Sequence, residues 1–200
     1  MSDIILQIDS IKKSYGRKIK NRQGGNEIEQ YYVIDDLCLE VPRGQITALI
    51  GGNGTGKTTL FNIISGFLDA DSGSVAFYNG ISKSDLLGLK PHKITQLGIG
   101  RLFQDDHLFD EMTVLENMLI ADQNNFGETP FVSLLFQRKT MKMETQKTEK
   151  VKGIFQNLFG AENPFWKNRN ELANTLSYGQ QRLLVLARLF MGNYKLVLLD

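Results

Sequence analysis

A glycine-rich turn between an apolar run and a helical pattern constrains this chain more than any other feature. Residues 46–50 are apolar, and residues 60–67 carry apolar side chains at helical spacing. Between them, GGNGTGKTT at residues 51–59 has the spacing G-x-x-x-x-G-K-[ST], in which glycines let backbone amides turn inward around phosphate oxygens. We therefore expect a buried parallel strand, a phosphate-binding loop and a helix, in that order.

Two side chains of this loop have the chemistry that a nucleoside triphosphate requires. Lys57 is expected to reach the β- and γ-phosphates, and Thr58 to offer its hydroxyl group to Mg²⁺. The positive end of the following helix dipole faces the same anion. The pattern thus predicts a nucleoside triphosphate site.

Composition and charge indicate an ordinary globular chain. Of its 200 residues, 42% are hydrophobic and 22% are charged. The formal net charge is +1, so nothing in the charge balance favours nucleic acid as a partner. The apolar runs are too short or too interrupted by charge to span a bilayer. The amino terminus lacks the pattern of a secretion signal, so we expect a cytoplasmic protein.

The first part of the chain has strand patterns. Residues 4–14 and 31–41 alternate between apolar and polar side chains, which predicts antiparallel strands. Residues 16–30 between them are polar and predict either a mobile loop or a long hairpin tip. Further strands are expected at residues 72–80 and 97–103. Cys38, the only cysteine, is expected to be a small core residue.

The pattern becomes helical after Gln104. Residues 113–116 fit a capping box that opens a helix through Asp122, and residues 131–159 carry apolar side chains at helical spacing. We expect a helical lobe inserted into an α/β core. A second capping box at residues 177–180 opens another helix, whose amino terminus is a second candidate anion site.

The sequence ends with a strand pattern and a carboxylate. Residues 195–199 predict a buried strand, and Asp200 follows directly. A carboxylate at the carboxyl edge of a parallel strand, in the same sheet as a phosphate loop, is expected to coordinate Mg²⁺.

Four stretches together resemble the nucleotide-binding subunit of ATP-binding cassette (ABC) transporters. They are GGNGTGKTT at 51–59, RLFQDDHLF at 101–109, LSYGQQ at 176–181 and LVLLD at 196–200. The resemblance implies an α/β P-loop NTPase core with a small antiparallel β subdomain and an inserted α-helical subdomain. It implies a single domain over residues 1–200, divided into a core (1–104), a helical subdomain (105–175) and the signature helix with the second Walker strand (176–200).

The resemblance also assigns roles to individual residues, with ATP and Mg²⁺ as cofactors. Lys57, Gln104 and Asp200 take catalytic roles, and Thr58, Gln104 and Asp200 contact the metal. Tyr15 stacks on adenine, although Tyr31 and Tyr32 compete for that role. The phosphate loop residues are Gly51, Asn53, Gly54, Thr55, Gly56, Lys57, Thr58 and Thr59, and those of the signature are Leu176, Ser177, Gly179 and Gln180.

Two departures from the family pattern stand out. Tyr178 lies in the signature where the family usually has glycine, which adds bulk at the expected dimer interface. The family's general base is a glutamate after the second Walker aspartate, and this sequence stops at Asp200. We therefore expect a fragment that is inactive alone, or else a binding protein that lacks its own base.

The function implied by the resemblance is an ATPase that powers transport across a membrane. The expected partners are transmembrane subunits and a second ATP-binding subunit, with two ATP molecules sandwiched between cassettes on the cytoplasmic face. Residues 89–121 look most like the ATPases of branched-chain amino acid importers and of lipopolysaccharide export. The alternatives are a soluble cassette ATPase of DNA repair or translation and a regulatory module that binds nucleotide without hydrolysing it.

Overall fold

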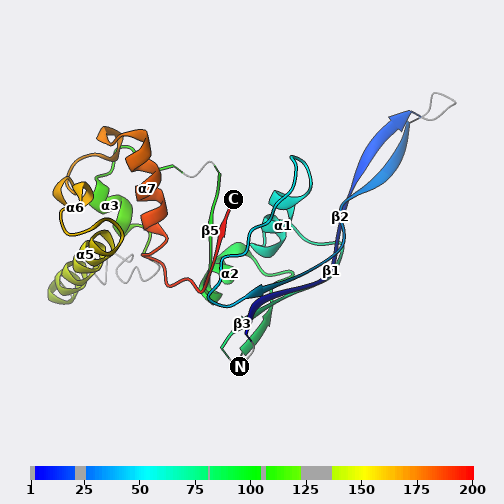
Figure 1. Cartoon of the computed structure of the whole chain (residues 1–200), viewed down its shortest axis with the longest axis horizontal. Coiled ribbons are helices and arrows are strands. Elements are labelled where there is room, and N and C mark those ends of the chain that lie inside the picture. The colour runs from blue at the N-terminus through cyan, green and yellow to red at the C-terminus, as the bar shows by residue number, and fades with distance from the viewer. Residues whose placement is uncertain (1–2, 21–25, 81, 105–106, 123–136) are drawn as a thin grey trace. The chain divides into compact units, whose positions relative to one another are not determined.

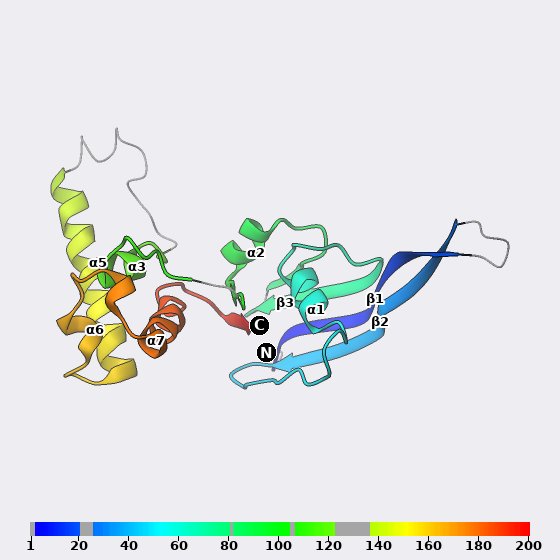
Figure 2. The same cartoon turned by 90° about the horizontal axis from the view of Figure 1, so that it is seen from above.

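The computed structural model describes residues 3–20, 26–80, 82–104, 107–122 and 137–200. The chain divides into two compact units, Met1–Arg101 together with Asp200, and Leu102–Leu199. We describe each unit by itself. Figures 1 and 2 show the elements of both units in two views.

An antiparallel sheet forms most of the first unit. Its strands are β1 (Ile4–Lys20), β2 (Asn26–Pro42), β3 (Ser72–Asn79) and β4 (Ser82–Asp85), in the order β2-β1-β3-β4. The strands predicted at residues 4–14 and 31–41 are confirmed, and they form parts of β1 and β2. Of the two possibilities for residues 16–30, the structure shows a hairpin that continues to Lys20 and resumes at Asn26 (Figure 1). Residues 21–25 lie outside the described part.

The core of the first unit is formed by its two middle strands, β1 and β3. Leu6 and Ile8 are fully buried on β1, and Phe77 is fully buried on β3 opposite Leu6. Successive residues in a strand face opposite sides, so the consecutive buried residues Val75, Ala76 and Phe77 show that both faces of the sheet are covered there. Register shifts along β1 and β2 coincide with left-handed backbone at Ser10 and Asp36, the signature of bulges.

Helix α1 (Lys57–Ile64) follows the phosphate loop, as predicted. The helix ends at Ile64, so Phe67, which the sequence pattern predicts to lie within the helix, lies beyond its end. Gly66 ends the helical path with φ of 73°, and a Cβ there would collide with the carbonyl oxygen of Leu89. Helix α2 (Pro91–Leu97) and strand β5 (Ile99–Leu102) come next. Helix α2 was not predicted, although Pro91 in its first turn is a typical helix start.

Two burial predictions are wrong. Residues 46–50 form no strand, and Ile46 and Ile50 are 101% and 92% exposed. A run of β-branched residues becomes a buried strand only where other strands pair with it, and in the described residues none pairs with 46–50. Cys38 is exposed rather than in the core, because the bulge at Asp36 shifts the alternation of β2.

The second unit is helical. Its elements are α3 (Val114–Leu119), α5 (Gln137–Phe159), α6 (Pro164–Lys167), the 3₁₀ helix η1 (Ala173–Thr175), α7 (Tyr178–Arg188) and strand β6 (Leu196–Leu199). Phe155, Phe159 and Phe165 form an aromatic cluster between α5 and α6, with ring centroids 4.6 to 6.3 Å apart. Figure 2 shows α3, α6 and α7 grouped around α5.

The sequence predictions for this unit are confirmed in part. Both capping boxes are present, at Thr113 and at Ser177. The first helix ends at Leu119 rather than Asp122, and the predicted helical pattern of residues 131–136 lies outside the described residues. Strand β6 buries only Leu198, so the buried strand expected there is half exposed. In the described ranges, no helix is both long and apolar enough to cross a bilayer.

Candidate functional site

The phosphate loop is an exposed turn that leads directly into α1. Gly56 precedes the helix with φ of 89°, a conformation that glycine adopts without strain. A Cβ on Gly56 would lie 2.9 Å from the carbonyl oxygen of Val33, so a side chain would also collide with β2. The sequence motif therefore has two physical reasons for glycine at this position.

Lys57 places a positive charge inside the loop. Its Nζ donates hydrogen bonds to the carbonyl oxygens of Gly51 at 2.8 Å and Gly52 at 2.6 Å. The Thr55 hydroxyl donates to the Gly52 carbonyl at 2.9 Å, which closes the turn. An ammonium group at the start of a helix, among backbone amides, suits a bound phosphate.

Thr58 and Asp200 lie together although 142 positions separate them in the sequence. The Thr58 hydroxyl donates to Oδ1 of Asp200 at 3.2 Å. Both groups supply the hard oxygen donors that Mg²⁺ prefers. The described residues hold no cluster of three or more histidine, cysteine or acidic side chains. Mg²⁺ usually takes one or two protein oxygens and completes its shell with water and phosphate oxygens, so Thr58 and Asp200 fit it.

Arg101 is a residue of this site that the sequence reading missed. Its Nη2 donates to Oδ2 of Asp200 at 2.7 Å, and the Arg101 and Asp200 side chains are only 5% and 14% exposed. The available signal was its position, two residues before the end of a predicted strand beside Gln104. A lone arginine in a short apolar run indicates a buried ion pair but does not identify the partner.

Tyr15, the predicted adenine contact, lies on β1 and is 39% exposed. Its ring centroid is 6.3 Å from that of Tyr31, and the Lys13 ammonium is 5.7 Å from the Tyr15 ring. Tyr32 lies instead near Lys12, whose Nζ is 5.9 Å from the ring. The role of Tyr15 toward adenine stays a prediction.

Asp71 anchors the strand segment that carries Tyr15. Its carboxylate accepts hydrogen bonds from Lys13 Nζ at 2.9 Å, from the Ser14 backbone at 2.6 Å and from the Ser14 hydroxyl at 2.7 Å. These donors, Lys13 first, lower the pKa of Asp71 from 3.8 to about 2. The carboxylate is therefore ionised throughout the neutral range.

The remaining predicted residues belong to the second unit. Gln104 is exposed after β5. Ser177 caps α7: its hydroxyl accepts from the Gln180 amide at 3.4 Å, and Oε1 of Gln180 accepts from the Ser177 amide at 3.0 Å. Tyr178 is 71% exposed, and its hydroxyl accepts from Nε of Arg182 at 3.1 Å. The roles of Gln104 and the signature toward nucleotide stay predictions.

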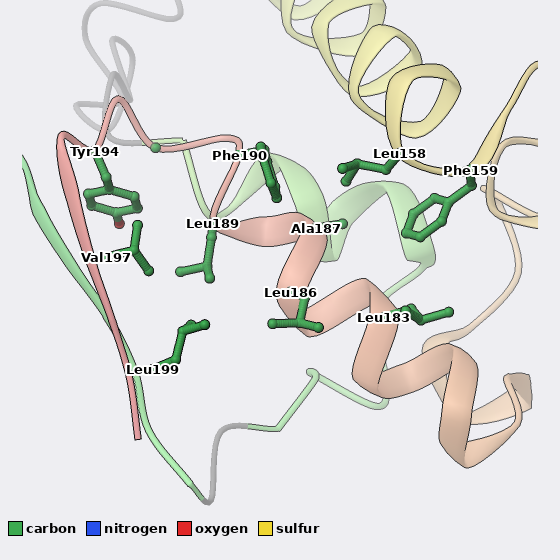
Figure 3. A pocket seen from close by; sticks show the side chains of 11 residues that line it. Leu158, Phe159, Leu183, Leu186, Ala187, Leu189, Phe190, Tyr194, Val197 and Leu199 are labelled. Carbon is green, nitrogen blue, oxygen red and sulfur yellow. The ribbon is translucent and has the colours of Figure 1, made fainter. Parts of the chain in front are cut away.

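An apolar cavity of about 520 Å³ lies within the second unit, and none of its described lining residues is a predicted site residue. Figure 3 shows Leu186 of α7 and Leu189 at its C-cap, with Val197 and Leu199 of β6, pointing into it. The described residues that line it carry no charged side chains. Phosphate binding requires donors and positive charge, so this cavity is not the nucleotide site.

Comparison with known sequences gives a consistent result. The family described as ABC transporter matches residues 34–200. The chain is 41% identical to a probable branched-chain amino acid transport ATP-binding protein LivG of Archaeoglobus fulgidus and 35% identical to that of Methanocaldococcus jannaschii, over 98% of this chain in both. BraF of Pseudomonas aeruginosa is 35% identical over 84% of this chain. The chain spans 62 to 67% of the length of these relatives.

Solved structures agree with the sequence comparison. A nucleotide-free ATP-binding cassette from an ABC transporter is 34% identical, with a TM-score of 0.69 over 98% of this chain and 68% of its own. The ADP conformation of the cassette MJ1267 is 32% identical, with a TM-score of 0.67 over 97% of this chain and 67% of its own. The fold class expected from the sequence is confirmed, and the chain belongs to the ABC transporter family.

Proposed function

We propose that this chain binds ATP with Mg²⁺ at the phosphate loop and is the ATP-hydrolysing subunit of a membrane transporter. One observation carries the proposal: Thr58, beside Lys57 at the start of α1, lies 3.2 Å from the Asp200 carboxylate. The phosphate-binding group, Lys57, and the metal-binding groups, Thr58 and Asp200, thus belong to a single site. The family and the names of the relatives support the same conclusion.

The chain's own residues divide the work between positioning and charge. The loop amides and Lys57 hold the phosphates and neutralise their negative charge. Thr58 and Asp200 hold Mg²⁺, which when bound neutralises charge that develops on the transferring phosphoryl group. Gln104 orients the attacking water, and Tyr15 stacks on the adenine. Hydrolysis additionally needs a general base that activates the attacking water.

The work performed is transport of a small solute through separate transmembrane subunits. The curated relatives are named as ATP-binding proteins of branched-chain amino acid transport. We propose branched-chain amino acids as the substrate class, with this chain on the cytoplasmic face of the membrane. Cargo is selected by the transmembrane and binding subunits, so the cassette itself supplies energy and not substrate recognition.

We also propose that two cassettes sandwich two ATP molecules. The amino terminus of α7 is a second anion site, because Ser177 caps it and Gly179 leaves space beside it. In a head-to-tail dimer with twofold symmetry, the signature of each copy meets the phosphates bound by the other.

Nucleotide titration of the purified protein tests the proposal. We expect Lys57→Ala to weaken Mg²⁺–ATP binding by about 10-fold or more, because a charge-assisted contact contributes about 1.5–3 kcal/mol. Lys83→Ala, on β4 with its ammonium 5.8 Å from the Tyr78 ring, is the matched control and should bind normally. An unaltered protein that binds no ATP would contradict the proposal. Binding without turnover in the assembled transporter would favour a regulatory module instead.

A further inference from the structure

Arg101 is buried beside the candidate metal carboxylate and makes several directed hydrogen bonds. Nη1 donates to Oδ1 of Asn62 at 2.8 Å and to the Ser65 hydroxyl at 2.8 Å, while Nη2 donates to Oδ2 of Asp200 at 2.7 Å. The guanidinium carbon also lies 5.9 Å from the Phe61 ring. A guanidinium group is always charged and rigidly planar, so these bonds hold it in one orientation.

The anchors of Arg101 lie on the helix that carries the phosphate-binding residues. Thr58, Asn62 and Ser65 occupy positions i, i+4 and i+7 of α1 and its C-cap, and therefore share one helix face. The Ser65 hydroxyl donates its hydrogen to the carbonyl oxygen of Phe61, which leaves its lone pairs for Arg101. One face of α1 thus contacts Asp200 directly through Thr58 and indirectly through Arg101.

The two oxygens of Asp200 have different partners. Oδ2 accepts from Arg101, and Oδ1 accepts from the Thr58 hydroxyl. We propose that Arg101 is a positioning residue that holds Oδ2 so that Oδ1 is the single Asp200 oxygen presented to the metal beside Thr58. This inference rests on the proposed Mg²⁺–nucleotide site.

The proposal separates the geometry of Arg101 from its charge. If the arginine served only as a counter-charge, any cation there would suffice, and removing it would strengthen metal binding by leaving Asp200 fully negative. A positioning role requires the planar fork, because only a guanidinium reaches Asn62, Ser65 and Asp200 together. Lysine has one compact ammonium on a flexible stem, so Arg101→Lys keeps the charge and loses the positioning.

Nucleotide affinity measured in EDTA, in Mg²⁺ and in Ca²⁺ tests the proposal. Mg²⁺ demands near-ideal octahedral geometry, whereas Ca²⁺ tolerates varied ligand arrangements. For both Arg101→Lys and Arg101→Met, we expect unchanged affinity in EDTA. The gain in affinity on adding Mg²⁺ should fall about 10-fold, the usual effect of losing a group that orients a metal ligand. The gain with Ca²⁺ should fall less.

Arg43→Lys is the matched control. Arg43 is half-buried in the same unit and donates from Nη2 to the carbonyl oxygen of Tyr78 at 2.7 Å, and Tyr78 lies outside the site. Its substitution should leave the gain with Mg²⁺ unchanged. The positioning role would be overturned if Mg²⁺ raised the nucleotide affinity of Arg101→Lys as much as that of the unaltered protein. It would also be overturned if Mg²⁺ raised the affinity of Arg101→Met more than that of the unaltered protein.

A second variant keeps the proposal testable if substitutions of Arg101 impair folding. Asn62→Ala removes one anchor of the guanidinium and leaves the ion pair with Asp200. We expect a loss of about 2- to 3-fold in the Mg²⁺ gain, smaller than in Arg101→Lys. An unchanged effect of Mg²⁺ on nucleotide affinity in Asn62→Ala would contradict the proposal.

If the unaltered protein binds no nucleotide, the proposed function fails and this inference fails with it. If the unaltered protein binds nucleotide and Mg²⁺ raises its affinity, the proposed function stands. The variants of Arg101 and Asn62 then show whether the positioning role is correct.

Discussion

Asp71 ties the turn after α1 to the start of the chain. In the folded protein the Lys13 and Ser14 donors hold its pKa at about 2, below the ordinary value of 3.8. A carboxylate whose pKa is lowered by folding contributes stability that is fully present above its unfolded pKa. That contribution is lost as the pH falls through the folded pKa, here between about pH 4 and about pH 2.

We therefore predict that Asp71→Asn destabilises the protein at pH 7 and that the difference from the unaltered protein narrows below pH 4. Urea unfolding followed by circular dichroism at a series of pH values measures this difference. Asp69→Asn, an exposed aspartate two residues earlier, is the control and should show no such trend. A difference that stays constant down to pH 2 would show that the Asp71 carboxylate does not stabilise the fold by its charge.

The predictability of a single residue depends on how local its partners are. The phosphate loop could be read from the sequence because its spacing lies within nine consecutive residues. Asp71 contacts Ser14 across 57 positions, and Arg101 contacts Asp200 across 99. No periodicity encodes such pairs, since they exist only after the strands have been brought together. Sequence reading therefore found the residues of the motif and missed those that hold it in place.

Helix α3 holds the segment before it through one buried amide. Asn117 is fully buried, and its Oδ1 accepts from the Phe109 amide at 2.9 Å. Its Nδ2 faces the carbonyl oxygens of Phe109, Met112 and Thr113 at 3.0, 3.3 and 3.1 Å. Every polar atom of this side chain is thus satisfied by backbone, which is the condition for burying it without loss of stability.

Asn117→Asp should destabilise the second unit by about 3 kcal/mol or more. The substitution removes the donor, turns an oxygen toward three carbonyls and buries a charge without a partner. The only tryptophan, Trp166, lies in this unit, so its fluorescence during urea unfolding measures the effect. Exposed Asn193→Asp is the matched control. A cost below about 1 kcal/mol would contradict the proposed role of the amide.

Elements that carry their own boundary signals were predicted well. The capping boxes at Thr113 and Ser177 need only four consecutive residues, and both are present. The strand expected at residues 46–50 is absent from the described fold, because a strand depends on neighbours that its own residues do not specify. Local chemistry thus predicted helix starts, and tertiary pairing decided strands.

At the scale of the whole molecule, the order of the motifs was the strongest sequence signal. Each of the three later stretches is weak alone, but their order along the chain identified the family that the comparisons confirm. The phosphate loop and Asp200 belong to the first unit, and the signature at Ser177 belongs to the second. A site that uses both the phosphate loop and the signature therefore needs a first unit and a second unit. These two units come either from one chain or from two chains.

Self-association distinguishes these possibilities. In the proposed head-to-tail dimer, each nucleotide is held by Lys57 of one copy and Ser177 of the other. We predict that a non-hydrolysable ATP analogue with Mg²⁺ promotes dimers in sedimentation velocity experiments. Lys57→Ala and Ser177→Arg should each abolish them, the first by removing phosphate contacts and the second by placing a long side chain at the cap of α7.

A mixture of the two variants gives the sharper test. One of its two sites combines the intact Lys57 of the Ser177→Arg copy with the intact Ser177 of the Lys57→Ala copy, while the other site carries both substitutions. Dimers should therefore reappear in the mixture, weaker than in the unaltered protein because one nucleotide is lost. Each variant alone has no intact site in any pairing. If the mixture stays monomeric while the unaltered protein dimerises, Lys57 and Ser177 do not share a nucleotide across the interface, because sharing requires complementation.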